Sequence, residues 1–166
     1  MLKSKQNIQS FLAAGATRGR EGFTLIEILV VIGLIAVLAA VVIIAINPAR
    51  QFAQARNSQR TSNVNAILNA IGQNMADNKG VFTCGAGALP AAATNMSNVV
   101  GDYNVRSCLV PTYMSELPYD PSTGSGWDGT NFNSKYSVAQ DVNGRVTISA
   151  PDTDVPPATV DISITR

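Results

Sequence analysis

The sequence contains no histidine among its 166 residues. That absence excludes Ser/His/Asp and Cys/His catalysis, and every metal site that depends on imidazole ligands. Two cysteines are too few for a zinc cage or an iron–sulfur site, although they suffice for one disulfide. Charged residues make up only 14% of the chain and the net charge is +1, so nucleic acid is not indicated as a partner. We therefore expect neither catalytic activity nor a cofactor.

One apolar block dominates the first third of the chain. Hydrophobic residues make up 46% of the sequence, and residues 28–46 contain no polar side chain. As a helix, residues 23–46 would extend for about 36 Å, enough to cross a hydrocarbon core of about 30 Å. No convincing small-x-small cleavage site follows the block, as it would in a cleavable secretory signal. The pattern predicts a membrane anchor.

Positive charge is concentrated before this block. Residues 1–22 contain four basic residues and one acidic residue, whereas the rest of the chain contains eight basic and ten acidic residues. A basic flank normally holds the N-terminal side of an apolar segment in the cytoplasm. We therefore expect a single-pass protein of the inner membrane with its C-terminal domain outside the cytoplasm.

The junction between the two segments has a distinctive sequence, EGFTLIEILV at residues 21–30. It resembles the N-terminal signature of type IV prepilins and of type II secretion pseudopilins. The resemblance implies that a prepilin peptidase/methyltransferase cleaves between Gly22 and Phe23 and then methylates the new amino terminus of Phe23. Residues 1–22 would accordingly be a cleaved leader.

Glu27 is the only charged residue in residues 23–46. A carboxylate among apolar side chains is costly in lipid and normally has a specific partner. The resemblance implies that this partner is the terminal amine of Phe23 in a neighbouring subunit, which makes Glu27 an assembly residue. The first turn of a helix also favours negative charge. The alternative is an acidic residue near the interface whose carboxylate reaches water.

The sequence after Pro48 predicts an amphipathic helix. Its apolar residues follow the i, i+3, i+4, i+7, i+11 spacing of one helical face: Val64, Ile67, Leu68, Ile71 and Met75. Asn78-Lys79-Gly80 is a typical end signal. We expect one helix from about residue 24 to about residue 77, bent or loosened at Asn47-Pro48. We expect its arginines, Arg50, Arg56 and Arg60, on a solvated face, with phosphate binding as the alternative.

Residues 80–130 are predicted to be rich in loops and to contain both cysteines, Cys84 and Cys108. Outside the cytoplasm a disulfide between them is favoured over free thiols. Their separation argues against a redox-catalytic pair of the CxxC type. Closing a loop of about 25 residues would stabilise the fold by roughly 3 kcal/mol in the chain-entropy model.

The segment ELPYDP at residues 116–121 resembles the LPxDP turn of major pseudopilins and related pilins, in some of which the following loop binds calcium. Asp120, Asp128 and Asp141 are weak candidates for calcium ligands, because no EF-type spacing is present. We favour turn capping for Asp120 and Asp128. Trp127 is expected to cover the edge of the core, with an adhesive tip as the alternative.

The last third of the sequence changes to a period of two. Residues 136–140, 146–149 and 160–165 alternate apolar and polar side chains, and Asn143-Gly144 between the first two runs is a strong hairpin signal. These patterns predict a small antiparallel sheet packed on the C-terminal half of the long helix. The predicted fold is α+β, with a long N-terminal helix whose two halves are transmembrane and amphipathic. It is the fold that the type IV pilin resemblance implies.

We divide the chain into four segments. They are a cleaved basic leader (1–22), a transmembrane and polymerisation helix (23–47), an amphipathic helix of the head domain (48–79), and a disulfide-linked loop region with the antiparallel sheet (80–166). The resemblance implies a structural subunit of a type IV pilus-like surface filament, found in the inner membrane and then in the extracellular pilus. The alternative is the major pseudopilin of a type II secretion system. The expected partners are copies of the chain, the prepilin peptidase, and the inner-membrane pilus or secretion assembly machinery. A membrane-anchored periplasmic binding or enzymatic domain is the alternative from a different class.

Overall fold

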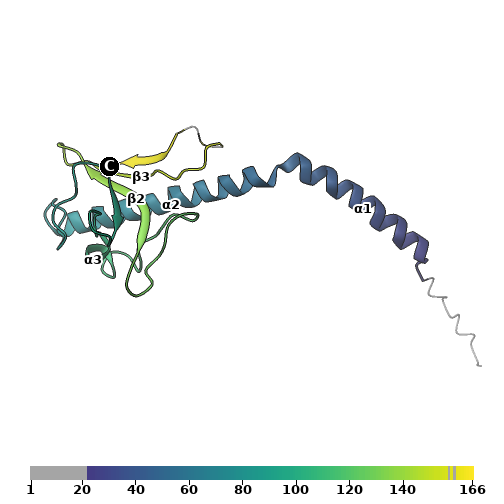
Figure 1. Cartoon of the computed structure of the whole chain (residues 1–166), viewed down its shortest axis with the longest axis horizontal. Coiled ribbons are helices and arrows are strands. Elements are labelled where there is room, and N and C mark those ends of the chain that lie inside the picture. Colours follow the sequence, from purple (N-terminus) through teal and green to yellow (C-terminus); the bar gives the residue numbers. More distant parts are fainter. Residues whose placement is uncertain (1–21, 157, 159) are drawn as a thin grey trace, which may run out of the picture. The chain divides into compact units, whose positions relative to one another are not determined.

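The computed structural model describes residues 22–156, 158 and 160–166 (Figure 1). The chain divides into two compact units, Met1–Ala45 and Ile46–Arg166, which are described separately. Residues 1–21 of the expected leader lie outside the described residues. The elements in chain order are α1 (Leu25–Ile46), α2 (Pro48–Asp77), β1 (Thr94–Ser97), α3 (Arg106–Leu109), β2 (Asn133–Gln140), β3 (Val146–Ala150) and β4 (Ile162–Thr165).

Apart from Glu27 in its first turn, helix α1 is apolar on every side. None of its 22 residues is buried, and the mean hydropathy of its most apolar stretch is 3.4. Its length and composition suit a helix that crosses a membrane. In water such a surface would be unfavourable, so α1 requires lipid or other apolar helices around it.

Asn47 separates α1 from α2. Pro48 has no N–H to donate to the preceding turn and its ring crowds the carbonyl of Ile44, which interrupts the helix. Asn47 adopts a left-handed conformation (φ 49°) and its side-chain oxygen accepts from the backbone N–H of Arg50 at 3.4 Å. Pro48 occupies the first helical position, which needs no N–H. The predicted interruption at Asn47-Pro48 is therefore confirmed.

The end of α2 follows the signal found in the sequence. Asn78 caps the helix, and Lys79 and Gly80 both have a positive φ. The Gly80 N–H donates to the carbonyl of Met75 at 2.8 Å, so a carbonyl in the last turn is satisfied. This geometry stops α2 after Asp77 and turns the chain back toward the sheet.

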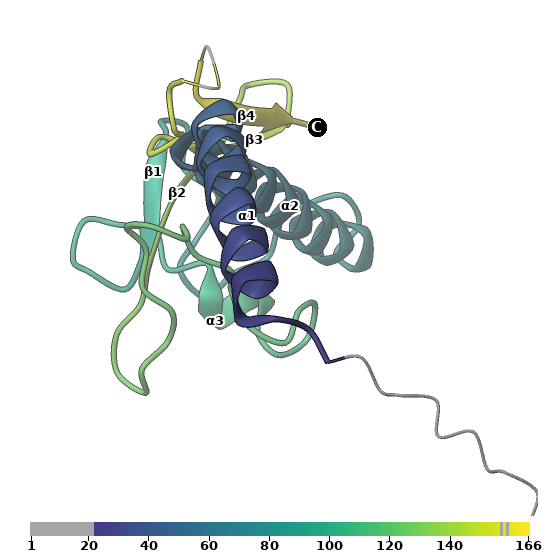
Figure 2. The same ribbon diagram turned by 90° about the vertical axis from the view of Figure 1, so that its right-hand side faces the viewer.

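The sheet has four antiparallel strands in the order β1-β2-β3-β4. Helix α2 packs against β3 and β4, and Figures 1 and 2 show it running along the sheet. The alternation predicted three of the four strands, but β1 and the short α3 lie in the region expected to be loops. The register of β1 against β2 shifts between Asn95 and Ser97, which marks a bulge. The third predicted strand is shorter than expected: it begins at Ile162, and Val160, which was expected within it, is exposed.

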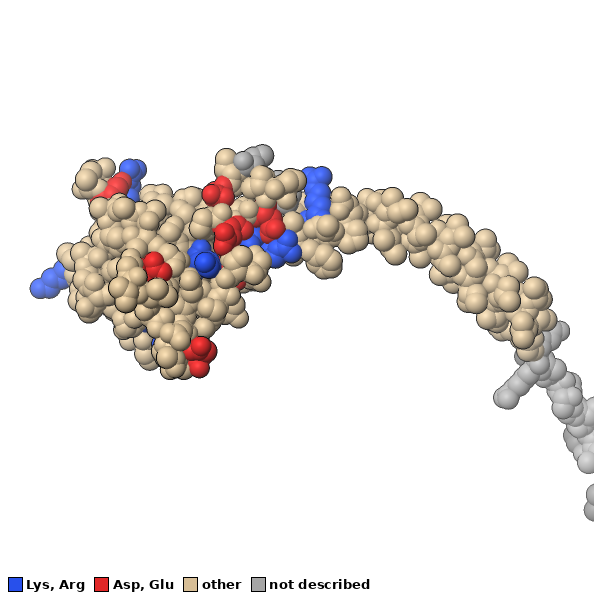
Figure 3. All heavy atoms as spheres, viewed as in Figure 1, with Lys and Arg blue, Asp and Glu red and all other residues tan. Residues whose placement is uncertain are grey.

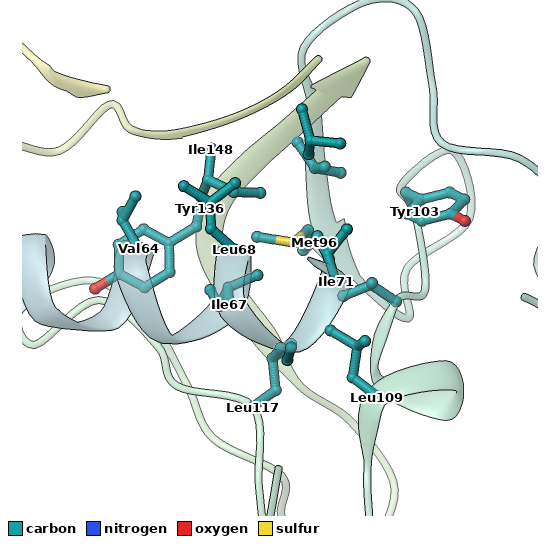
Figure 4. Close-up of a cluster of buried hydrophobic side chains, with 14 of the residues drawn as sticks. Val64, Ile67, Leu68, Ile71, Met96, Tyr103, Leu109, Leu117, Tyr136 and Ile148 are labelled. Atoms are coloured by element: carbon teal, nitrogen blue, oxygen red, sulfur yellow. The ribbon is translucent and has the colours of Figure 1, made fainter. Parts of the chain in front are cut away.

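The core lies between α2 and the sheet (Figure 4). The predicted stripe on α2 is buried at Val64, Ile67, Leu68 and Ile71, and its last member, Met75, is partly buried against the same cluster. Other large buried side chains come from the strands, the loops and α3: Phe82, Leu89, Met96, Tyr103, Leu109, Leu117, Phe132, Tyr136, Val138 and Ile148. The amphipathic pattern thus gives the correct buried face of α2.

A hairpin joins β2 to β3 where Asn143-Gly144 predicted it. Gln140 pairs with Val146, so five residues form the loop. Gly144 has φ 81°, and the Asp141 side chain accepts from the backbone N–H groups of Asn143 and Arg145, both at 2.9 Å. An aspartate cap therefore stabilises this turn in addition to the glycine.

Cys84 and Cys108 form a disulfide, with their Cα atoms 5.2 Å apart. It links the segment that follows α2 to the short helix α3, and both cysteines pack against the core. The pairing expected from the sequence is confirmed. The bond fixes a region that contains β1 and little other regular structure.

Candidate processing and assembly site

The residues that carry the signature lie at the start of α1. Gly22 and Phe23 precede the helix and are exposed, and the Phe23 side chain is 83% exposed. A peptidase would need an extended, accessible segment on both sides of the bond that it cleaves. Gly22 and Phe23, the described residues next to this bond, are non-helical and exposed.

Thr24 and Glu27 form a reciprocal cap at the N-terminus of α1. The Thr24 hydroxyl accepts from the Glu27 backbone N–H at 3.2 Å, while Glu27 Oε2 accepts from the Thr24 backbone N–H at 3.0 Å. The Thr24 hydroxyl also donates to Glu27 Oε2, at 2.9 Å. This is the capping-box arrangement, in which two otherwise unpaired backbone donors are satisfied.

The capping box holds the Glu27 carboxylate at the end of the helix. Within the described residues, only Oε2 of the carboxylate is engaged, and only by Thr24. Thr-x-x-Glu at residues 24–27 is itself a recognisable cap signal, in addition to the favourable helix dipole at Glu27. Thr24 is therefore the site residue that sequence reasoning missed, although its signal was present.

Charge is distributed unevenly over the described surface. On the face seen in Figure 3, α1 shows no Lys, Arg, Asp or Glu atoms, and the charged side chains gather over the globular unit. Glu27 is the only charged residue in α1. Any directional polar contact between α1 helices must therefore come from their N-terminal ends.

A comparison with known families finds a match at this end of the chain. Residues 17–46 match the family described as the prokaryotic N-terminal methylation motif, which is typical of type IV prepilins and type II pseudopilins. Over these residues the chain is similar to prepilins. The motif implies processing by prepilin peptidase, and together with the apolar helix it is consistent with anchoring in the inner membrane before assembly. No curated protein and no solved structure matches the chain.

A second group of polar side chains, centred on Arg60, lies inside the unit Ile46–Arg166, which is called the head from here on. The Arg60 side chain is fully buried and its guanidinium pairs with two carboxylates. Nε donates to Asp120 Oδ2 at 2.6 Å, Nη2 donates to Asp120 Oδ1 at 3.1 Å, and Nη1 donates to Asp154. The expectation of a solvated face for the arginines is wrong at this position, because both partners come from loops distant in sequence.

This cluster joins three segments of the head. Asp120 belongs to the ELPYDP segment, Asp154 belongs to the loop after β3, and Arg60 lies on α2. Arg56 also binds Asp154 with two hydrogen bonds, at 2.9 and 2.7 Å. Gly124 allows the close turn after Asp120, because a Cβ there would lie 2.5 Å from the Asp120 backbone nitrogen. The cluster thus holds both loops against α2.

The protonation states of the cluster follow from these contacts. Burial alone would raise the pKa of Asp120, but hydrogen bonds from Arg60, Ser122 and Thr123 hold it well below its usual value. Hydrogen bonds from Arg56 and Arg60 lower the pKa of Asp154 to about 2. Burial opposes the charge of Arg60, yet the two carboxylates raise its pKa. All of these groups are therefore charged at neutral pH.

The weak calcium candidates lie in separate turns. Asp120 accepts from the backbone N–H groups of Ser122 and Thr123, in addition to binding Arg60. Asp128 accepts from the N–H groups of Thr130 and Asn131, and Asp141 caps the β2–β3 hairpin. Within the described residues no group of three or more metal-ligating side chains occurs. A guanidinium, rather than open space, lies beside the Asp120 carboxylate.

Trp127 lies outside the buried core. Its ring is stacked on the Arg106 guanidinium, 4.2 Å from the ring centroid, and the side chain is 40% exposed. Glu116 fixes this guanidinium through two hydrogen bonds of 2.7 Å. The indole therefore covers a surface ion pair and not the edge of the core that the sequence suggested.

Proposed function

We propose that this protein is the structural subunit of a type IV pilus-like surface filament, polymerised through α1 after removal of residues 1–22. The observation that carries the proposal is the methylation motif on a helix whose entire apolar surface is exposed. Such a helix is stable in a bilayer, and equally stable when copies of it surround one another. Assembly would exchange lipid for neighbouring α1 helices.

Cleavage between Gly22 and Phe23 would create a charged amine one residue before the capping box. Glu27 of one copy would pair with the amine of Phe23 on the next, because two opposite charges in an apolar environment attract strongly. The remaining surface of α1 consists of similar aliphatic side chains that give little preference for one alignment. The pair would therefore set the register of successive subunits.

A second candidate is the major pseudopilin of a type II secretion system. One observation favours it: ELPYDP resembles the LPxDP turn, its Leu117 is buried in the core and its Asp120 is buried against Arg60. The segment is therefore part of the structural framework of the head. Both candidates share processing, anchoring and assembly, and they differ in the length and location of the filament.

The test is electron microscopy of filaments sheared from cells, combined with mass spectrometry of their subunit. The proposal expects long surface filaments whose main component begins with N-methylated Phe23. Absence of filaments, with loss of exported proteins from the medium after deletion of the gene, would favour the pseudopilin. An uncleaved chain in assembled material would overturn both.

A further inference from the structure

The beginning of α2 directly follows the membrane-spanning helix. Only Asn47 separates Ile46 from Pro48. With 22 residues at 1.5 Å each, α1 is about 33 Å long, slightly more than a hydrocarbon core of about 30 Å. Arg50 and Phe52 follow Ile46 within about 10 Å of chain, while each headgroup layer is about 5–8 Å thick. Both side chains therefore lie in or against the headgroup layer when α1 spans the bilayer.

Arg50 differs from the next two arginines of α2. Arg56 and Arg60 are held by Asp154 and Asp120 inside the head. Arg50 is exposed and makes no ion pair within the described residues. It is therefore the cation of this part of α2 that is available to an external anion.

Phe52 is the aromatic residue of the same segment. Its side chain is 65% exposed, although the next residue, Ala53, is buried. Arg50 and Phe52 point to nearly opposite sides of the helix, because successive residues are about 100° apart. A helix that emerges from a bilayer has headgroups on every side not covered by protein, so both residues can contact lipid. Aromatic and basic residues are enriched at this level of membranes.

A hollow of about 410 Å³ adjoins Arg50. It is lined by Asn47, Ala49, Arg50, Ala53 and Pro156. Its walls are short side chains, so a group entering it meets the arginine as the only charge in the lining. A phosphate with part of its glycerol has a suitable size and the complementary charge.

We propose that residues 48–52 are an interfacial anchor for phospholipid, in which Arg50 binds headgroup phosphates and the Phe52 ring inserts beside them. The two contacts would fix the depth of α1 in the bilayer before assembly. The proposal rests on membrane anchoring alone, and the filament role proposed above can fail without affecting it.

The test measures the depth of position 52 in vesicles of phosphatidylethanolamine and phosphatidylglycerol that contain the full chain. Trp127 is the only tryptophan, so F52W is made in a W127F background. The matched control is V142W in the same background, because Val142 is fully exposed at the β2–β3 hairpin. Lipids brominated near the carbonyl end of the acyl chains should quench F52W strongly and leave V142W unquenched.

Arg50 is tested by adding R50Q or R50K to the F52W variant. R50Q should reduce the quenching, and R50K, which keeps a charge able to bind phosphate, should retain it. Equal quenching of F52W and V142W would overturn the proposal. A blue-shifted F52W emission without bromine quenching would also overturn it, because the ring would then be buried against another copy. If R50Q leaves the quenching of F52W unchanged, Arg50 plays no part in the anchor, and that part of the proposal is overturned.

Discussion

Arg60 and Asp120 form an ion pair in which both side chains are completely buried, with Arg60 Nε 2.6 Å from Asp120 Oδ2. The net contribution of such a buried pair to stability is smaller than the cost of removing one partner, because both charges lose their hydration on folding. The pair mainly favours the fold in which Arg60 and Asp120 meet, because any other packing of the head would leave one of the two charges buried without its partner. The pair thereby ties the ELPYDP segment to α2.

Replacement of Arg60 by methionine should destabilise the head by about 3–5 kcal/mol, because it leaves the Asp120 carboxylate buried without its cation. The free energy of unfolding would be measured by urea denaturation of the full chain in detergent. Arg50→Met is the matched control, since Arg50 is exposed, and it should change the value by no more than about 0.5 kcal/mol. Equal effects of the two changes would show that the buried pair is not important for stability.

Acid should weaken the head through Asp120 and Asp154. Both pKa values are lowered in the folded state, that of Asp154 to about 2, so the unfolded chain binds protons first. Stability from these groups is complete above their ordinary pKa of about 4, and it declines progressively as the pH falls from there toward their lowered folded pKa values. Thermal melting measured from about pH 6 down to about pH 2 should show this decline. Asp154→Asn should make it shallower, and an unchanged slope would contradict the assignment.

Loss of the Cys84–Cys108 disulfide should cost about 3 kcal/mol, because the reduced unfolded chain regains the freedom of a closed loop. The double variant C84S/C108S would be compared with the parent chain by urea denaturation. Adding reductant to the double variant should have no effect, which serves as the control. Two alkylatable thiols in the native, exported protein would show that the bond does not form in the cell.

Two substitutions separate the charge of Glu27 from its capping role. Glu27→Gln retains an acceptor for the Thr24 N–H but loses the charge, whereas Thr24→Ala loses the hydroxyl contacts and keeps the carboxylate. If the pair with the Phe23 amine aligns subunits, E27Q should abolish filaments while leaving cleavage intact, and T24A should still assemble. Filament counts by microscopy and the cleavage state by immunoblot give the result. Normal filaments from E27Q would reject the pairing.

Regular patterns made the secondary structure predictable. The apolar spacing on α2 and the alternation in β2 and β3 reflect burial on one face, and burial is what hydrophobic patterns record. Strand β1 gave no such signal, because Met96 is the only apolar residue among its four. The strand forms because β2 offers it a partner, which is a tertiary effect.

The polar sites were less accessible to sequence reasoning. Arg60 was expected in water because arginine is rarely buried alone, and its partners lie 60 and 94 positions further along the chain. Only the folded chain brings them together. The signature at Glu27 was recognisable because its residues are contiguous, and Thr24 could have been found from the same four positions.

The two edge strands of the sheet differ from its interior in a way that would matter in the proposed filament, where many copies lie close together. Strand β1 carries a register shift against β2, and β4 has only four residues. Long, regular edges offer unpaired backbone groups to any neighbouring strand, whereas bulged and short edges do so poorly. Heads brought together at high local density can therefore remain separate folded bodies instead of merging into a continuous intermolecular sheet. Close crowding of copies is thus compatible with protection from aggregation.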